Sequence, residues 1–377
     1  MISLVEIWER KRALSSRLKE ILSQHEIEAS RRDHHSLRLP RPCGLTVHTG
    51  IGCRFGCTYC YIYDMGFPYK PKPYPLSGDQ LAYAISINPS VVIGADGTPI
   101  AFGAVTEPFL EETADKAIEY LDAIAGYLGN PIQFSTKAYL SDHLVGRIRK
   151  SVDQASALVT IVTLELYKIL EPGAPTPEER LESIRRLSKA GIHTALFLRP
   201  IIPGISLEEI EEIISLALDA GAKGLVMGSM RVTEGIIERL RKVGYPYLEK
   251  IIERAPRAVK GSKQITLKMD DLKRMVHRVA KRLDLEIYPS ACAANMEAHK
   301  LSCHACRMGP CGNPENLPDF DLNEIMRLGA NYGIKVREAA FLDGTIRMKV
   351  LGNKMAVKQF TAFLKWSTKR IIAVRRG

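Results

Sequence analysis

Residues 49–67 of the chain read TGIGCRFGCTYCYIYDMGF, and a short β-rich run, GLTVHT at 44–49, leads into them. The stretch spaces Cys53, Cys57 and Cys60 as Cys-x3-Cys-x2-Cys, among glycines that allow a loop to wrap closely around a bulky group. Three thiolates can bind three irons of a [4Fe-4S] cube and leave the fourth iron open. The alternative is a zinc site completed by His48. The spacing therefore predicts a metal-binding loop directly after the first strand.

The stretch from 44 to about 230 alternates short β-rich runs with segments of helical periodicity, which is the pattern of parallel βα units. We expect strands at 45–49, 91–93, 100–105, 132–136, 158–164, 194–199 and 224–227. We expect helices at 78–87, 111–128, 141–151, 177–190 and 207–220. The predicted fold class is α/β, with a partial (β/α)6-type barrel whose chemistry lies at the carboxyl ends of the strands.

The cysteine loop, with the aromatic Tyr59 just before Cys60, resembles the signature of the radical S-adenosylmethionine (SAM) superfamily, from Leu45 to about Thr233. The segments AFGAVTEPF, QFSTKAYL, ILEPGAPTPEERLESIRRLSKAGI and LRPIIPGI together resemble the spore photoproduct lyase-like group. The resemblance implies that SAM binds the open iron and is cleaved reductively to a 5′-deoxyadenosyl radical. It also implies an electron donor such as ferredoxin or flavodoxin.

The resemblance further implies site residues, with Cys53, Cys57 and Cys60 as catalytic cluster ligands. The implied SAM-binding residues are Tyr59, Thr106, Glu107, Ser135, Lys137, Glu165, Arg180, Ile201 and Gly204. Glu107 is implied to receive the SAM amino group, and Arg180 to pair with the carboxylate. Gly204 belongs to a turn expected near adenine. For each polar residue, an ordinary strand-end cap or a surface ion pair is the alternative.

A second group of cysteines supplies four ligands without outside help. Its members are Cys292, Cys303, Cys306 and Cys311. An auxiliary [4Fe-4S] cluster and a structural zinc site both fit four thiolates, and we favour the cluster because the spacing lacks the paired Cys-x2-Cys zinc pattern. His299 and His304 could each replace a thiolate, but we expect them at the surface.

The remaining cysteine is Cys43, just before the first strand. Photoproduct lyases use a further barrel cysteine as hydrogen donor, and this sequence has none between Cys60 and Cys292. Cys43 matches that position poorly. We therefore expect the shared core to cleave SAM and the target to differ from a thymine dimer.

The chain is expected to form five units. They are an N-terminal helical arm (1–40), the radical SAM partial barrel (41–233), a helical extension (234–287), an auxiliary cysteine-rich segment (288–317) and a basic α+β module (318–377). From Asp321 onward, twelve Lys and Arg residues face four acids, which places +8 of the overall +11 formal charge there. This module weakly resembles KH-type RNA-binding modules, although GNK at 352–354 stands where a Gly-x-x-Gly loop belongs.

The basic module predicts an anionic partner, and we expect the substrate to be tRNA or another RNA. Two alternatives are a peptide or protein, and a small metabolite with the second cluster as sulfur donor. A non-enzymatic iron-sulfur or zinc nucleic-acid-binding protein is disfavoured by the cysteine triad. The sequence shows neither a signal peptide nor a membrane-spanning run, so we expect a cytoplasmic protein in a reducing compartment.

Overall fold

The computed structural model describes residues 3–41 and 44–377, so Cys43 lies outside the described residues. Seven parallel strands form one sheet in the order β1-β4-β5-β6-β7-β8-β11. The strands are β1 (Leu45–Thr46), β4 (Ile100–Phe102), β5 (Ile132–Thr136), β6 (Ser156–Val159), β7 (His193–Ile201), β8 (Gly224–Ser229) and β11 (Glu286–Tyr288). Because β1 and β11 are the two edges, the sheet is an open partial barrel, and the predicted α/β class is confirmed.

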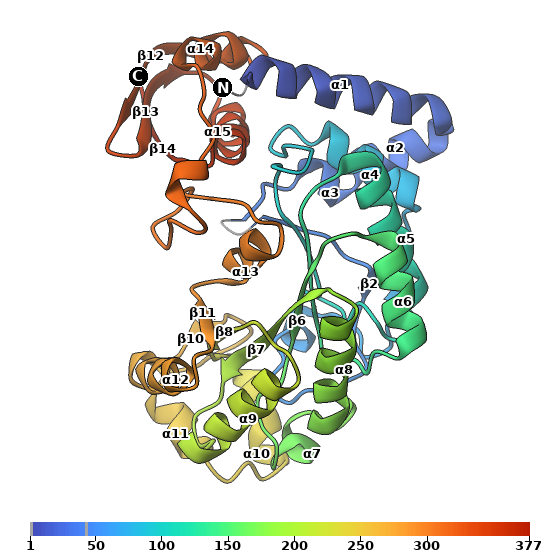
Figure 1. The fold of residues 1–377 in the computed structure, drawn as a ribbon, viewed down its shortest axis with the longest axis vertical. Coiled ribbons are helices and arrows are strands. Elements are labelled where there is room, and N and C mark those ends of the chain that lie inside the picture. The colour runs from blue at the N-terminus through green and yellow to red at the C-terminus, as the bar shows by residue number, and fades with distance from the viewer. Residues whose placement is uncertain (1–2, 42–43) are drawn as a thin grey trace.

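Helices cover the outer face of this sheet (Figure 1). They are α4 (Gly78–Ile87), α5 (Ala114–Ala123), α6 (Asp142–Ser151), α8 (Pro177–Lys189), α9 (Leu207–Asp219) and α12 (Asp270–Arg282). Sequence signals explain where several begin, because Ser77 and Thr176 each form a capping box with the third helical residue. The predicted helix at 111–128 is instead α5 followed by one π-helical segment, Ile124–Leu128.

The strand predicted at 91–93 does not form. Val92 donates its N–H to Thr98 Oγ1 at 3.0 Å and accepts from the Thr98 N–H at 2.9 Å, so its polar groups are satisfied within a local loop. Burial without sheet pairing explains why this apolar run resembled a strand. β4 also ends three residues early, next to Gly103, which has φ +93°.

The N-terminal arm is divided into three helical segments. The arm consists of α1 (Leu4–Ile21), α2 (Gln24–Arg32) and α3 (His34–Leu37). Figure 1 shows α1 running from the C-terminal module to the barrel helices. Leu4 belongs to the core of the module, and Leu18 to the core of the barrel. The buried Lys11 donates to the carbonyl oxygens of Asn88 and Val91, the latter at 2.6 Å.

The extension predicted as helical contains α10 (Glu234–Lys242), α11 (Leu248–Glu253) and α12, and also strands. β9 (Arg231–Val232) pairs with β10 (Ile265–Thr266), and β11 joins the barrel sheet beside β8. The barrel therefore continues past residue 233. The short β11 was missed because three residues carry little alternation on their own.

Helix α13 (Ala291–Ala298) packs against the inner face of the barrel, where Ala293 and Ala294 contact Leu158 and Val226. Figure 1 shows it between the barrel and the C-terminal module. That module contains α14 (Leu322–Ala330), β12 (Lys335–Leu342), β13 (Thr345–Leu351), α15 (Lys354–Thr368) and β14 (Ile371–Arg376). Its strands lie in the order β12-β13-β14 and enclose a separate core with α14 and α15. Among the described residues, no helix is long and apolar enough to cross a membrane.

Candidate active site

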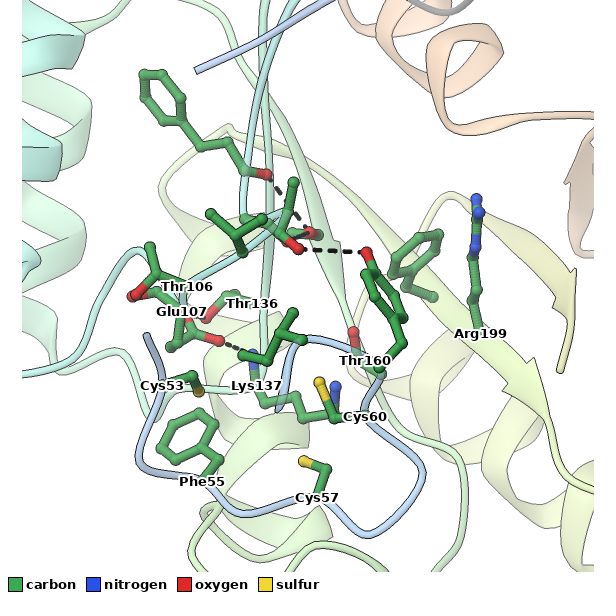
Figure 2. Close-up of a pocket in the computed structure, with 18 of the residues that line it drawn as sticks. Cys53, Phe55, Cys57, Cys60, Thr106, Glu107, Thr136, Lys137, Thr160 and Arg199 are labelled. Carbon is green, nitrogen blue, oxygen red and sulfur yellow. Dashed lines mark hydrogen bonds between the residues drawn. The ribbon is translucent and has the colours of Figure 1, made fainter. Parts of the chain in front are cut away.

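The three cysteines of the first loop line a single cavity of about 390 Å³ at the carboxyl ends of the strands (Figure 2). The loop leaves β2 (Gly50–Ile51), which pairs with β3 (Lys72–Pro73), and ends at the 3-10 turn Tyr63–Met65. Cys57 is buried, whereas Cys53 and Cys60 are half-buried. The predicted ligands therefore meet at one place.

Arg239 of α10 holds this loop in position. Its guanidinium forms an ion pair with Asp64 through two nitrogens, each at 2.9 Å, and donates to the backbone oxygens of Thr58 at 3.1 Å and Cys60 at 2.7 Å. Thr233 Oγ1 donates to the same carboxylate at 2.5 Å. Sequence analysis missed Arg239, because one arginine among several on a polar helix carries no distinguishing signal.

The chemistry of the three thiols suits a bound metal cluster. Burial raises the pKa of Cys53 to about 11 and raises the pKa values of Cys57 and Cys60 as well. Without a metal, these thiols stay protonated at neutral pH, so that metal binding must displace protons.

The zinc alternative would need His48 as a fourth ligand. His48 is not among the residues that line the cavity of the three cysteines. Its Nε2 lies 3.3 Å from Arg38 Nη1, and its ring lies 5.0 Å from that of His34. The structure thus groups His48 with the histidines of the N-terminal arm and gives no support to a zinc site that includes it.

Four of the predicted SAM-binding side chains, together with Tyr59, line the same cavity. They are Thr106, Glu107, Ser135 and Lys137. The Glu107 carboxylate accepts from Thr136 Oγ1 at 2.5 Å and from the Lys137 N–H at 2.8 Å. Burial raises the pKa of Glu107, although both hydrogen bonds oppose the rise. Glu107 is thus fixed by backbone and hydroxyl donors at the ends of β4 and β5.

Lys137 carries the positive charge of this region. Its Nζ lies 3.9 Å from Glu171 Oε1 and 5.7 Å from the centre of the Tyr59 ring, and Figure 2 shows it reaching toward Cys60. Burial alone would lower the pKa of Lys137, but the thiolate form of Cys57 and the Glu171 carboxylate raise it. The ammonium is therefore kept charged beside the cysteine loop.

The other four predicted SAM contacts do not line the cavity. Arg180 is fully buried, and it pairs with Glu171 while donating to the Thr160 carbonyl at 3.1 Å. Glu171 also accepts from the Tyr59 hydroxyl, so the acid that sequence analysis overlooked joins Arg180 to the cysteine loop.

Glu165 is exposed, and its N–H donates to Glu209 of α9 at 3.3 Å. Ile201 packs in the barrel core, and Gly204 lies against Tyr247, where a Cβ would clash at 2.3 Å. The strand-end positions that face the cavity instead come earlier in β7, at the end of β8 and in β9. They are Phe197, Arg199, Pro200, Ser229 and Arg231. Period-two alternation along the predicted strand at 194–199 would have placed Phe197 and Arg199 on one face.

The second cysteine group lies where α13 meets the C-terminal module. Cys303 and Cys311 exchange two backbone hydrogen bonds of 2.9 and 2.8 Å, which close the intervening loop that carries Cys306. Ser290 Oγ lies 3.2 Å from Cys292 Sγ. The buried Lys369 reaches between the parts, with its Nζ donating to the Gly97 carbonyl at 2.9 Å and its carbonyl accepting from the His304 N–H at 2.8 Å.

The two histidines of this segment are His299 and His304. Among the described residues, neither belongs to a group of three or more donors that lie close enough together to hold a metal ion. His299 is half-buried, and its Nε2 accepts from the Ile132 N–H at 3.3 Å while its Nδ1 lies 2.9 Å from the Asn295 carbonyl. Both ring nitrogens of His299 are thus used by the barrel base and by α13 itself.

The fold and the site define a class of protein. Residues 47–217 match the model of the Radical SAM superfamily. This part of the chain is a radical SAM domain, a type of domain that uses a [4Fe-4S] cluster and SAM.

Particular relatives share the fold. Spore photoproduct lyase complexed with dinucleoside spore photoproduct is 16% identical with a TM-score of 0.51, covering 64% of this chain and 74% of that chain. A mutant of that lyase with bound AdoMet and the same ligand is 15% identical with a TM-score of 0.53, covering 68% of this chain and 79% of that one.

Two relatives found by sequence similarity match about half of this chain. An uncharacterized protein of Mycobacterium tuberculosis is 24% identical over 202 residues, which is 49% of this chain and 58% of that protein. The chain thus spans a little over half the length of that relative. The Radical SAM Nalpha-GlyT isomerase of Pseudomonas phage M6 is 24% identical over 222 residues, covering 54% of this chain and 44% of that protein.

Proposed function

We propose that the whole chain is an enzyme that cleaves SAM reductively and uses the resulting radical to modify a nucleic acid. The observation that carries the first half is the convergence of Cys53, Cys57 and Cys60 with Glu107 and Lys137 on one cavity. When bound, the cluster and SAM supply an electron and a 5′-deoxyadenosyl radical that abstracts hydrogen.

The chain's own residues would bind SAM and orient it in the cavity. Glu107 presents a fixed carboxylate that suits the amino group of SAM, and Lys137 presents an ammonium that suits a carboxylate. Arg180 does not line the cavity. It is buried and forms an ion pair with Glu171, which in turn lies near Lys137. This assignment moves the proposed carboxylate contact from Arg180 to Lys137.

Anaerobic reconstitution tests the cleavage step. Protein supplied with iron, sulfide, SAM and dithionite should form 5′-deoxyadenosine, and the Cys57→Ala variant should form none because the cube loses one of three thiolates. Wild-type protein that yields no 5′-deoxyadenosine would contradict the proposal.

The nucleic-acid half rests on the exposed face of the β12-β13-β14 sheet. Arg347 and Lys349 of β13 point away from the buried Ile346 and Met348, and Lys349 stands directly opposite Arg375 of β14. Like charges that face each other across strands destabilise a sheet, and phosphate groups would relieve the repulsion. Glu338 offsets part of the charge, with 3.4 Å between its Oε1 and Lys349 Nζ.

The named ligands of the relatives point the same way, since the lyase structures hold a dinucleoside photoproduct. We propose RNA, including tRNA, as the substrate of this chain, with single-stranded DNA as the competing polymer. Comparing both in one binding and turnover assay separates them, because only the true substrate should raise 5′-deoxyadenosine formation above the uncoupled rate.

We also propose a second [4Fe-4S] cluster on Cys292, Cys303, Cys306 and Cys311. Support comes from the number of ligands, since four thiolates complete a cube, and from their spacing in the sequence, which lacks the paired Cys-x2-Cys pattern of zinc sites. Lys369 is buried near Cys303. Burial lowers the pKa of Lys369, and Cys303 acts in the opposite direction and raises it. A positive charge here would stabilise thiolate ligands.

A further inference from the structure

Two arginines line the same cavity as the three cysteines and Glu107. Arg199 lies in the carboxyl half of β7 and Arg231 in β9, and both side chains are exposed at the mouth. In Figure 2, Arg199 stands across the cavity from Thr106 and Glu107 and points away from the cysteine loop. The two ends of one cavity therefore differ in the groups they offer.

Packing holds the Arg199 side chain at this mouth. Its stem crosses Gly228 of β8 so closely that a Cβ there would lie 2.6 Å from Arg199 Cγ and 2.7 Å from Cδ. Its guanidinium carbon lies 5.8 Å from the centre of the Phe197 ring. The glycine and the aromatic ring thus give the side chain a defined path, and that path ends in a guanidinium facing the opening.

Neither arginine is neutralised by the protein. Among the described residues, no ion pair within 4.0 Å involves Arg199 or Arg231. Arg231 donates to the neutral amide oxygen of Gln264 at 3.3 Å. Most other cations near the site have acidic partners, as Arg239 has Asp64 and Lys137 has Glu171.

A tyrosine hydroxyl lies in the same cavity as the two arginines. Tyr61 lines the cavity and donates to the Ala104 carbonyl at 3.3 Å, so it is held without an acidic partner. These three side chains of the cavity are therefore cationic or neutral.

We propose that Arg199 and Arg231 bind a phosphate group of the substrate nucleotide, next to the residue that is modified. This rests on the proposed function and names the group by which the site recognises its substrate. A guanidinium binds phosphate through two parallel hydrogen bonds, and a cleft with unpaired cations concentrates an anion. The basic sheet face would hold the polymer, and this pair would align one phosphate so that the attached nucleoside faces the cysteine loop.

A charged and a neutral ligand of the same shape test the proposal. The probes are a dinucleoside monophosphate and its methylphosphonate isostere, titrated into reconstituted protein with saturating SAM and no reductant. We expect wild-type protein to bind the charged probe at least tenfold more tightly. Arg199→Gln and Arg231→Gln should each remove most of that ratio, and Arg185→Gln, an exposed change on the outer helix α8, should keep it.

Gly228→Ala offers an independent variant, because its added methyl group should displace Arg199 without removing any charge. It should reduce the same ratio. Equal binding of the two probes by wild-type protein, or an unchanged ratio in Arg199→Gln and Arg231→Gln, would overturn the proposal. So would an equal loss of SAM affinity in these variants, since the arginines would then serve SAM. The assay needs no turnover, so absence of 5′-deoxyadenosine from wild-type protein counts against the proposed function alone.

Discussion

Arg239 and Asp64 form a two-point ion pair that joins helix α10 to the loop of the three cysteines, with both N···O distances at 2.9 Å. The same guanidinium binds the carbonyls of Thr58 and Cys60. The cluster loop is therefore held by a residue more than 170 positions away in sequence.

Replacing this arginine should loosen the cluster. We expect Arg239→Gln to lose iron to a chelator about tenfold faster than wild-type protein, because hydrogen bonds that involve a charged group contribute about 1.5–3 kcal/mol. The rate of bleaching of the iron-sulfur absorbance measures it. Arg241→Gln, exposed on the same helix, is the matched control. Equal rates for Arg239→Gln and this control would show that the ion pair does not position the loop.

Metal content should distinguish the two cysteine groups. Reconstituted wild-type protein should hold about eight irons and eight sulfides, and Cys306→Ala should hold about four, because each cube contains four irons. Iron and sulfide analysis with elemental zinc measurement checks this. About four irons with one zinc in wild-type protein would contradict the second cluster and leave the first intact.

Salt dependence should reveal phosphate contacts on the C-terminal sheet. For tRNA binding, the logarithm of affinity should fall linearly with the logarithm of salt concentration, and Arg347→Gln with Arg375→Gln should reduce the slope by about one unit for each lost contact. Arg185→Gln with Lys189→Gln changes the charge by the same amount on exposed positions of the barrel and should not alter the slope. A slope that stays the same in the sheet variant would remove this face from the interface.

Substitution is the better test here than deletion of the module. Leu4 of α1 and Val92 of the barrel belong to the module's core, and Lys369 binds the Gly97 carbonyl. Removing the module would uncover apolar surface and disturb the second cysteine group, so a loss of binding could not be assigned to charge.

The attachment of the N-terminal arm should depend on pH. Burial lowers the pKa of Lys11 from 10.5 to about 7, so between about pH 7 and 10.5 the detached arm binds a proton that the attached arm does not. Stability should then rise with pH across this window, by about 1.4 kcal/mol per unit at most. Urea titrations at pH 7, 8 and 9 can follow fluorescence, because Trp8 and Trp366 both belong to the hydrophobic contacts around the module.

Lys11→Met is the comparison that isolates this effect. It removes the titrating group and keeps an unbranched side chain of similar length, so its urea midpoint should change less between pH 7 and 9 than that of wild-type protein. A pH dependence of the same size in both proteins would assign the effect to other groups, such as Lys369, whose burial lowers its pKa to about 8.

The sequence alone determined the features that depend on neighbouring residues. The Cys-x3-Cys-x2-Cys loop is a local pattern, and so are the capping boxes at Ser77 and Thr176 and the long amphipathic helices. Helix α4 and strand β5 were therefore predicted with their observed bounds. Glu107 and Lys137 were also predicted, because they lie at the ends of strands whose carboxyl edges share one face of the sheet.

Only the tertiary structure decided which distant groups meet at the cavity. Glu165 and Glu171 are both acids after β6, yet only Glu171 turns inward, where Arg180 and Tyr59 satisfy it. The arginine pair at the mouth depends on how β7 and β9 end beside each other in space. Such choices follow from burial and from the pairing of charges across long sequence separations, which outweigh local preference because an unpaired buried charge is too costly to keep.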